Sequence, residues 1–135
     1  MTIHFTPIGY VRTGVPDEEM PHFYAVSEVE GILDILPKYE QGLGDLQLGQ
    51  QINVLFHFDR SPAFSQDQLR QIPRKRDELR GVFSICTPIR PNAIGLSVLT
   101  VLGIDGGRIR VKGLDMFDGT PVLDIKPVPA TSKDK

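Results

Sequence analysis

The sequence of 135 residues has no tryptophan and a single cysteine, Cys86. One thiol cannot form a disulfide within the chain, so a disulfide-stapled fold is excluded and a reducing, cytoplasmic setting is favoured. No apolar run approaches the ~20 residues of a membrane-spanning helix, and the N-terminus lacks a signal-peptide pattern, so we expect no membrane association. The net charge of −2 gives no general attraction to nucleic acid.

Several common functional motifs are also missing. Neither G-x-G-x-x-G nor G-x-x-x-x-G-K-[ST] occurs, which argues against nucleotide binding of the Rossmann or Walker type. His4, His22 and His57 have no partner at metal-ligand spacing, so we expect no metal. Cys86 has no C-x-x-C mate and no base that the sequence can locate, which favours a packed thiol over a nucleophile.

What is present is a series of short segments rich in apolar residues and separated by Gly and Pro. We expect strands at 3–12, 26–36, 52–58, 81–86, 94–104, 108–112 and 122–126, a helical turn at 39–43 and a short helix at 65–69 capped by Ser65. The glycine-rich turn at 105–107 predicts a hairpin. The prediction is one all-β domain over 1–127, a six- or seven-stranded partly open barrel or sandwich with one or two short helices, and a flexible tail at 128–135.

Two segments place charged or amide side chains between Pro and Gly residues. These residues are Arg90 and Asn92 in segment 87–97, and Asp115 and Asp118 in segment 113–127. Pro fixes φ and Gly permits a positive φ, so both loops are held in one shape. They could be no more than rigid corners whose side chains bond their own backbone. The alternative is a single preorganised ligand site.

Positive charge gathers in segment 70–80, whereas segment 14–40 carries seven acids against one lysine. The basic residues are Arg70, Arg74, Lys75, Arg76 and Arg80. Such a cluster is usually a solvated face. Its functional alternative is contact with an RNA phosphate backbone, which requires positive charge but reads no sequence.

The two polar segments together resemble a known family. R-P-N-A-I-G-L-S at 90–97, followed by G-L-D-M-F-D-G-T-P-V-L-D-I-K-P at 113–127, is similar to the TsaA-like (TrmO-type) family of S-adenosylmethionine-dependent tRNA methyltransferases. I-G-Y-V-R at 8–12 and the phenylalanine-rich strand at 52–58 fit the same pattern, so the resemblance covers nearly the whole chain. It implies an all-β homodimer that binds S-adenosylmethionine near the subunit interface. The implied reaction methylates N6 of threonylcarbamoyladenosine beside the tRNA anticodon.

The resemblance also implies which residues form the site. The donor-binding positions carried over by motif are Phe23, Tyr24, Ala25, Asp59, Arg60, Cys86, Leu96, Met116, Phe117, Asp118 and Gly119. The loop 116–119 is expected to act mostly through its backbone. Arg90 and Asn92 are expected to shape the pocket or to meet the substrate. Asp115 or Asp118 is expected near the positive sulfonium and is the candidate general base for a weakly acidic nitrogen nucleophile.

Two features depart from the family pattern. Cys86 stands where longer members have an arginine that contacts the donor. The chain also ends shortly after Pro127, where longer members continue into a C-terminal domain associated with tRNA. Three functions therefore remain open: the tRNA methyltransferase, a methyltransferase for a smaller or different substrate, and a non-catalytic S-adenosylmethionine-binding module.

Overall fold

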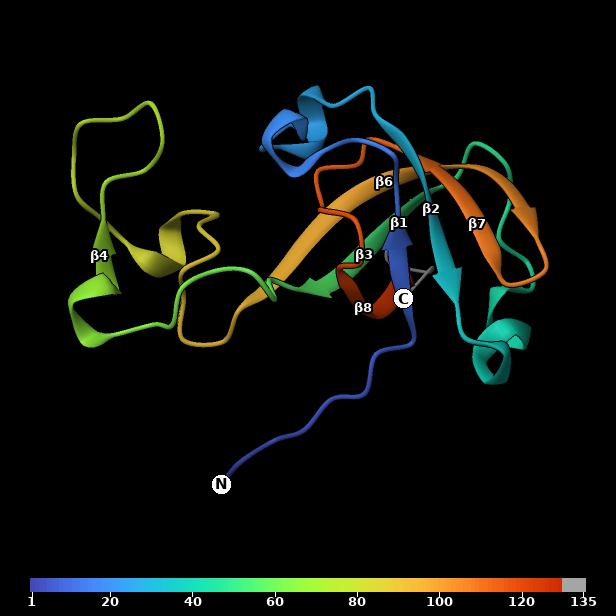
Figure 1. Cartoon of the computed structure of the whole chain (residues 1–135), viewed down its shortest axis with the longest axis horizontal. Helices are drawn as coiled ribbons and strands as arrows, with labels where there is room; N and C mark the ends of the chain where they lie inside the picture. The colour runs from blue at the N-terminus through green and yellow to red at the C-terminus, as the bar shows by residue number, and fades with distance from the viewer. Residues whose placement is uncertain (130–135) are drawn as a thin grey trace.

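Six strands form a closed barrel in the computed structural model, which describes residues 1–129 (Figure 1). They are β1 (Gly9–Arg12), β2 (Glu30–Ile35), β3 (Gln51–His57), β6 (Ile94–Asp105), β7 (Arg108–Lys112) and β8 (Pro121–Pro127). Their order round the barrel is β1, β2, β7, β6, β3, β8, and neighbouring strands are antiparallel. Two short strands, β4 (Arg70–Gln71) and β5 (Arg80–Gly81), pair with each other outside the barrel.

Short 3₁₀ helices lie in the segments between the strands: η1 (Asp17–Glu19), η2 (Tyr24–Val26), η3 (Pro37–Leu43), η4 (Gln66–Leu69) and η5 (Val82–Ser84). Such helices occur in short pieces because their hydrogen-bond geometry is poorer than that of an α-helix. Within residues 1–129, no helix has the length and apolar character needed to cross a membrane.

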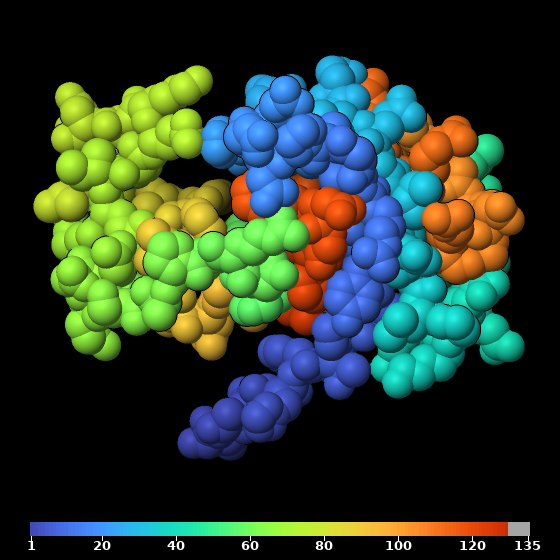
Figure 2. Space-filling view, in the orientation of Figure 1, coloured from blue at the N-terminus to red at the C-terminus, as the bar shows by residue number. Residues whose placement is uncertain are grey.

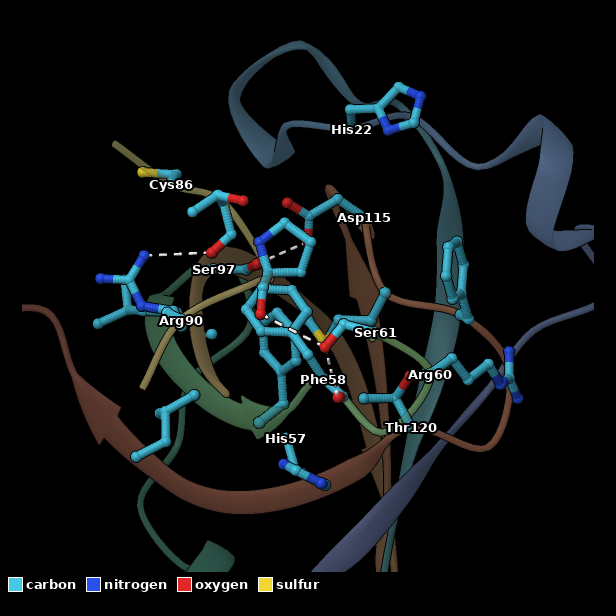
Figure 3. A pocket seen from close by; sticks show the side chains of 18 of the residues that line it. His22, His57, Phe58, Arg60, Ser61, Cys86, Arg90, Ser97, Asp115 and Thr120 are labelled. Atoms are coloured by element: carbon cyan, nitrogen blue, oxygen red, sulfur yellow. Dashed lines mark hydrogen bonds between the residues drawn. The ribbon is translucent and has the colours of Figure 1, made fainter. Parts of the chain in front are cut away.

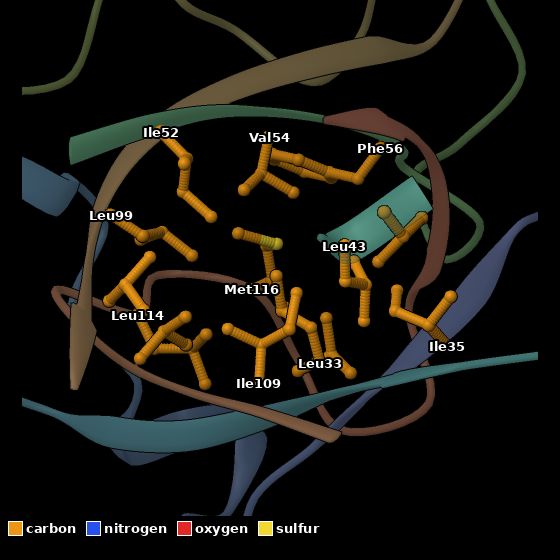
Figure 4. Packing of buried hydrophobic residues seen from close by; sticks show 14 of the residues in the cluster. Leu33, Ile35, Leu43, Ile52, Val54, Phe56, Leu99, Ile109, Leu114 and Met116 are labelled. Atoms are coloured by element: carbon orange, nitrogen blue, oxygen red, sulfur yellow. The ribbon is translucent and has the colours of Figure 1, made fainter. Parts of the chain in front are cut away.

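The barrel interior is packed with alternate side chains of its strands (Figure 4). In β3, for example, Ile52, Val54 and Phe56 are buried, as expected for successive side chains that point to opposite faces of a strand. Leu114 and Met116, from the segment after β7, enter the same core. Each fully buried side chain of this kind contributes roughly 1.5–3 kcal/mol, so this core is the main source of stability.

The ring closes through its shortest pairing, between β1 and β8. Only two residue pairs form it, Gly9 with Val122 and Tyr10 with Pro121. A Cβ atom at Gly9 would lie less than 3 Å from backbone atoms of Asp34 and Ile35. Glycine is therefore required where β1 passes β2 on its way to the closure.

Residues 59–93 leave the barrel between β3 and β6 and form an outer lobe that carries β4 and β5 (Figure 1). Figure 2 shows this outer lobe standing beside the barrel, with a hollow between its upper part and the blue segment that carries η1 and η2. The loops therefore place two separate parts of the chain opposite each other.

The all-β class and the hairpin at 105–107 are confirmed, and the barrel is closed rather than partly open. The helical segments predicted at 39–43 and 65–69 are the 3₁₀ elements η3 and η4, and η1, η2 and η5 were not predicted. Three strands are shorter than predicted. The strand predicted at 3–12 begins only at Gly9, because residues 3–8 pair too little with the barrel to form a ladder. The strand predicted at 26–36 is reduced to β2 at Glu30–Ile35, since Val26 belongs to η2. In the segment 81–86, only Gly81 belongs to a strand, and η5 follows directly.

Two further predictions concern the cap of a short helix and the C-terminal tail. Ser65 precedes η4 but makes no cap hydrogen bond, and its hydroxyl bonds the Asp67 carboxylate instead. The predicted tail at 128–135 lies, from residue 130 onward, outside the described residues.

Candidate functional site

A pocket of about 550 Å³ lies where the barrel meets the outer lobe (Figure 3). It is lined by residues 21–24, by 56–62 at the end of β3, by 85–90 of the outer lobe, by 94–97 at the start of β6, and by 115–117 with Thr120. Much of this lining is apolar or aromatic, with a few polar groups between. Both the volume and the chemistry are typical of small-molecule and cofactor sites.

The segment after β7 places one carboxylate in the pocket. The amides of Gly113 and Leu114 donate to the carbonyl of Val29 at 2.9 and 3.1 Å, which fixes the segment across the barrel end. Leu114 and Met116 are buried in the core, whereas Asp115 alternates with them and lines the pocket. Since the Met116 side chain fills the core, this residue is left to meet a ligand mainly through its backbone.

Asp115 is a partly buried acid held by protein donors. The hydroxyl of Ser97, which is only 1% exposed, donates to Oδ1 of Asp115 at 2.6 Å. Burial raises the pKa of Asp115 to about 6, while hydrogen bonds from Ser97 and from the Tyr24 backbone oppose part of that rise. The carboxylate is therefore charged at neutral pH but close to the range in which it takes up a proton.

Arg60 clamps two parts of the pocket wall. Its guanidinium donates to the Asp17 carboxylate at 2.7 Å and to the backbone carbonyl of Asp118. It also lies over the Phe117 ring, 5.6 Å from the ring centre. The loop after β7 is thus tied both to the loop that carries η1 and to the chain that follows β3.

Arg90 organises the wall contributed by the outer lobe. Its guanidinium donates to the carbonyls of Ile85 and Thr87, both at 3.1 Å. The Thr87 hydroxyl bonds Gln71 at 2.9 Å, and the Gln71 amide donates to the carbonyl of Ile89 at 2.8 Å. Arg90 therefore holds the 85–90 loop in shape.

Most of the predicted site residues meet in this pocket; they are Phe23, Tyr24, Asp59, Arg60, Cys86, Arg90, Leu96, Asp115, Met116 and Phe117. Four others lie off its lining, namely Ala25, Asn92, Asp118 and Gly119. The Asp118 carboxylate accepts a hydrogen bond of 2.9 Å from the amide of Thr13, so it ties two loops together at an exposed position. Asn92 is exposed in the bend that precedes β6.

Sequence reasoning missed several lining residues, above all Ser97 and the group around the end of β3. That group includes Phe58 and His57, whose Nδ1 lies 3.1 Å from the carbonyl of Ala93. A signal for Ser97 was available, since it is the one hydroxyl within the apolar run 94–99. Among residues 1–129, no group of three or more His, Cys, Asp or Glu side chains is placed to hold a metal ion.

Comparisons with known proteins all point to one family. Residues 12–133 match the family model described as the tRNA-methyltransferase O N-terminal domain. An S-adenosyl-L-methionine-binding protein of Archaeoglobus fulgidus is 36% identical over 121 residues, which are 89% of this chain and 85% of that protein. The human tRNA (adenine(37)-N6)-methyltransferase is 35% identical over 127 residues, 90% of this chain and 29% of the human protein.

A solved structure agrees with these relatives. The crystal structure of TrmO has a TM-score of 0.77 to this chain at 30% identity, and the likeness covers 100% of this chain and 63% of that one. The chain spans only about a third of the longer curated relatives that it matches. The match over residues 12–133 shows that the chain belongs to the tRNA-methyltransferase O N-terminal domain family.

Proposed function

We propose that this chain binds S-adenosylmethionine in the pocket and methylates N6 of threonylcarbamoyladenosine beside the anticodon of tRNA. The observation that carries the proposal is one partly buried carboxylate, Asp115, on the wall of an apolar and aromatic pocket in a chain of this family. The names of the A. fulgidus and human relatives support the donor and the substrate respectively.

The pocket residues fit such a donor. A volume of about 550 Å³ falls in the range of sites that enclose nucleoside-sized ligands. Phe23, Tyr24, Phe58 and Phe117 line the pocket, and aromatic rings are the side chains on which a purine stacks. Ring faces and a carboxylate also attract a cation, and S-adenosylmethionine supplies its methyl group from a positively charged sulfonium. Asp59, at an exposed position of the lining, adds a second hydrogen-bond acceptor.

The protein's contribution to methyl transfer would be mainly orientation. An in-line displacement gains up to ~7–11 kcal/mol when the reacting atoms are held in line. Arg60 and Arg90 fix the loops on either side of the pocket, so its shape is set before a ligand enters. As the new N–C bond forms and the C–S bond breaks, the nitrogen loses a proton, and we assign Asp115 rather than Asp118 as its acceptor. Of these two carboxylates, Asp115 is the one on the pocket lining.

The tRNA contact is proposed for the outer lobe. Its basic residues Arg70, Arg74, Lys75, Arg76 and Arg80 are all exposed, and among residues 1–129 only Arg80 is paired with an acid, Glu78, at 3.5 Å. Arg74, Lys75 and Arg76 lie together in the turn between β4 and β5, where phosphates can approach. Because the outer lobe also supplies a wall of the pocket, a bound tRNA would lie close to the site of transfer.

We also propose that the chain is a homodimer. The outer lobe exposes four large apolar side chains, Leu69, Ile72, Leu79 and Phe83, of which Phe83 is 78% exposed. Large apolar side chains left exposed on one lobe favour a protein contact. Sedimentation equilibrium is expected to give twice the chain mass, and replacing Ile72 and Phe83 by serine is expected to return it to one.

The function is tested by two linked measurements. Calorimetry is expected to detect binding of S-adenosylmethionine. Mass spectrometry of nucleosides from treated tRNA is then expected to show threonylcarbamoyladenosine heavier by one methyl group. Binding without any methylated nucleoside would favour the non-catalytic module, and methyl transfer to another acceptor would favour a methyltransferase of different specificity. Absence of binding would contradict the proposal altogether.

A further inference from the structure

We propose that Asp115 makes the pocket prefer the cationic methyl donor over its neutral thioether product, and that Ser97 is the positioning residue that holds Asp115 for this selection. The inference rests on the proposed function and explains how the pocket could tell the methyl donor from its product. S-adenosylmethionine and S-adenosylhomocysteine differ by one methyl group and one positive charge. Apolar contacts and stacking on the purine treat them alike, so selection depends on groups that attract the positive sulfur, and a carboxylate carries a full opposite charge.

Asp115 is the carboxylate of the lining that is withdrawn from water. The second lining acid, Asp59, is exposed, so solvent screens its charge. Asp115 is flanked in sequence by two core residues and receives the hydroxyl of a side chain that is itself only 1% exposed. In such surroundings the attraction between opposite charges is several times stronger than in bulk water.

The positive charges of the lining are already committed to other partners. Arg60 is paired with Asp17, and Arg90 donates to two carbonyls of its own loop. Among residues 1–129, neither guanidinium forms a hydrogen bond or an ion pair with the Asp115 carboxylate, so the charge of Asp115 remains available to a ligand. The other titratable groups of the lining are His22, Tyr24, His57 and Cys86, of which the two histidines and the thiol are exposed.

Ser97 fixes the carboxylate in place. It lies within β6, where it is paired with Val54 of β3, so its position is set by the barrel rather than by a loop. Its hydroxyl bonds one oxygen of Asp115, and this bond favours the charged form of the acid. Loss of the hydroxyl would free the carboxylate to turn and would make it easier to protonate.

Methyl transfer removes the positive charge from the sulfur, and with it the attraction to Asp115. The product is then held only by contacts that it shares with the donor, which favours its release. The same reasoning predicts a dependence on pH. Burial raises the pKa of Asp115 to about 6, so the preference is present above that pH and falls as Asp115 takes up its proton below it.

The test compares binding of the two ligands rather than turnover. Calorimetry with S-adenosylmethionine and with S-adenosylhomocysteine would be run between about pH 7.5 and pH 5 on the wild-type protein, on D115N, on S97A and on D105N. The last removes a carboxylate of the same kind from the exposed end of β6, away from the pocket lining. At about pH 7.5 the wild-type protein and D105N are expected to prefer the donor by about tenfold or more.

In D115N the ratio of the two affinities is expected to fall close to one at every pH. In S97A the preference is expected to be reduced, and its loss on acidification is expected to begin at higher pH, a shift that a purely structural defect would not produce. Equal affinities in the wild-type protein, or an unchanged ratio in D115N, would overturn the inference while leaving the proposed function intact. Failure of the wild-type protein to bind either ligand would overturn both. Should D115N fail to fold, the shift of the pH dependence between the wild-type protein and S97A decides, because Ser97 acts on Asp115.

Discussion

The hydroxyl of Ser97 donates a 2.6 Å hydrogen bond to Oδ1 of Asp115, across 18 positions of sequence that include the whole of β7. Both ends of this contact are fixed by the barrel. Ser97 is held by its pairing with β3, and the segment before Asp115 by two amide bonds to Val29. Because this contact lies at the edge of the packed core, the pKa of Asp115 bears directly on the free energy of unfolding.

Replacing Asp115 with asparagine is expected to stabilise the fold at neutral pH. Burial raises the pKa of Asp115 from 3.8 to about 6, so its stabilising contribution is complete below about pH 4 and is lost as the pH rises through about 6. At about pH 7.5 we expect D115N to be more stable than the wild-type protein by about 1–3 kcal/mol, and the difference to vanish near pH 4. Urea unfolding at the two pH values measures this; a variant less stable by the same amount at both would contradict it.

Replacing Gly95 with alanine is expected to damage the pocket from within the barrel. A Cβ atom there would lie less than 3 Å from three atoms of the Phe56 ring, which has little room to move in the core. We expect a loss of about 1–3 kcal/mol, with weaker donor binding. G14A is the matched control, since a Cβ atom at Gly14 meets nothing within 4 Å. Equal midpoints of unfolding for the two variants would count against this packing.

Replacing Arg60 with glutamine is expected to weaken donor binding about tenfold, because the loop that carries Phe117 and Asp118 loses its clamp. The free energy of unfolding is expected to change by less than about 1 kcal/mol, since the pair with Asp17 is largely exposed. R12Q is the control: Arg12 also pairs with an acid and lies over a ring, but it is not part of the pocket. Calorimetry on both variants decides, and an equal loss of affinity would refute a specific role for Arg60.

Replacing Arg74 and Arg76 with glutamine is expected to weaken tRNA binding and to lower its salt dependence. Each phosphate contact contributes about one unit to the slope of log K against log salt, so the double variant is expected to lose about one to two units. A double variant of Arg108 and Arg110, exposed on β7 and off the pocket lining, removes the same charge elsewhere. Filter binding over a salt series measures both slopes; identical slopes would place the tRNA contact outside the outer lobe.

The barrel could be predicted largely from local patterns. β3 and the β6–β7 hairpin carry the alternation and the turn glycines that define them, and both form as expected. The outer lobe could not, because its strands have two residues each and its apolar side chains stay exposed. The pattern of Phe83 and Ile85 reads as a strand, although that part of the chain forms a 3₁₀ turn beside the pocket.

The sequence predicted which segments form the site but not the role of each residue in it. Sequence placed Asp115 and Asp118 in one motif and had no means to separate them, since both lie in the same polar loop. Only the fold buries the neighbours of Asp115 in the core and leaves Asp118 exposed. The contact between Ser97 and Asp115 depends on how β6 and β7 pair, and a register is a property of the assembled sheet.

Hydrogen exchange with and without S-adenosylmethionine tests most directly whether the donor lies in this pocket. Protection is expected in peptides that cover 22–26, 57–61, 85–90, 94–97 and 113–117, with no change at Pro37–Leu43, on the η3 turn away from this lining. Protection confined to Pro37–Leu43, or binding without protection of 113–117, would contradict the account.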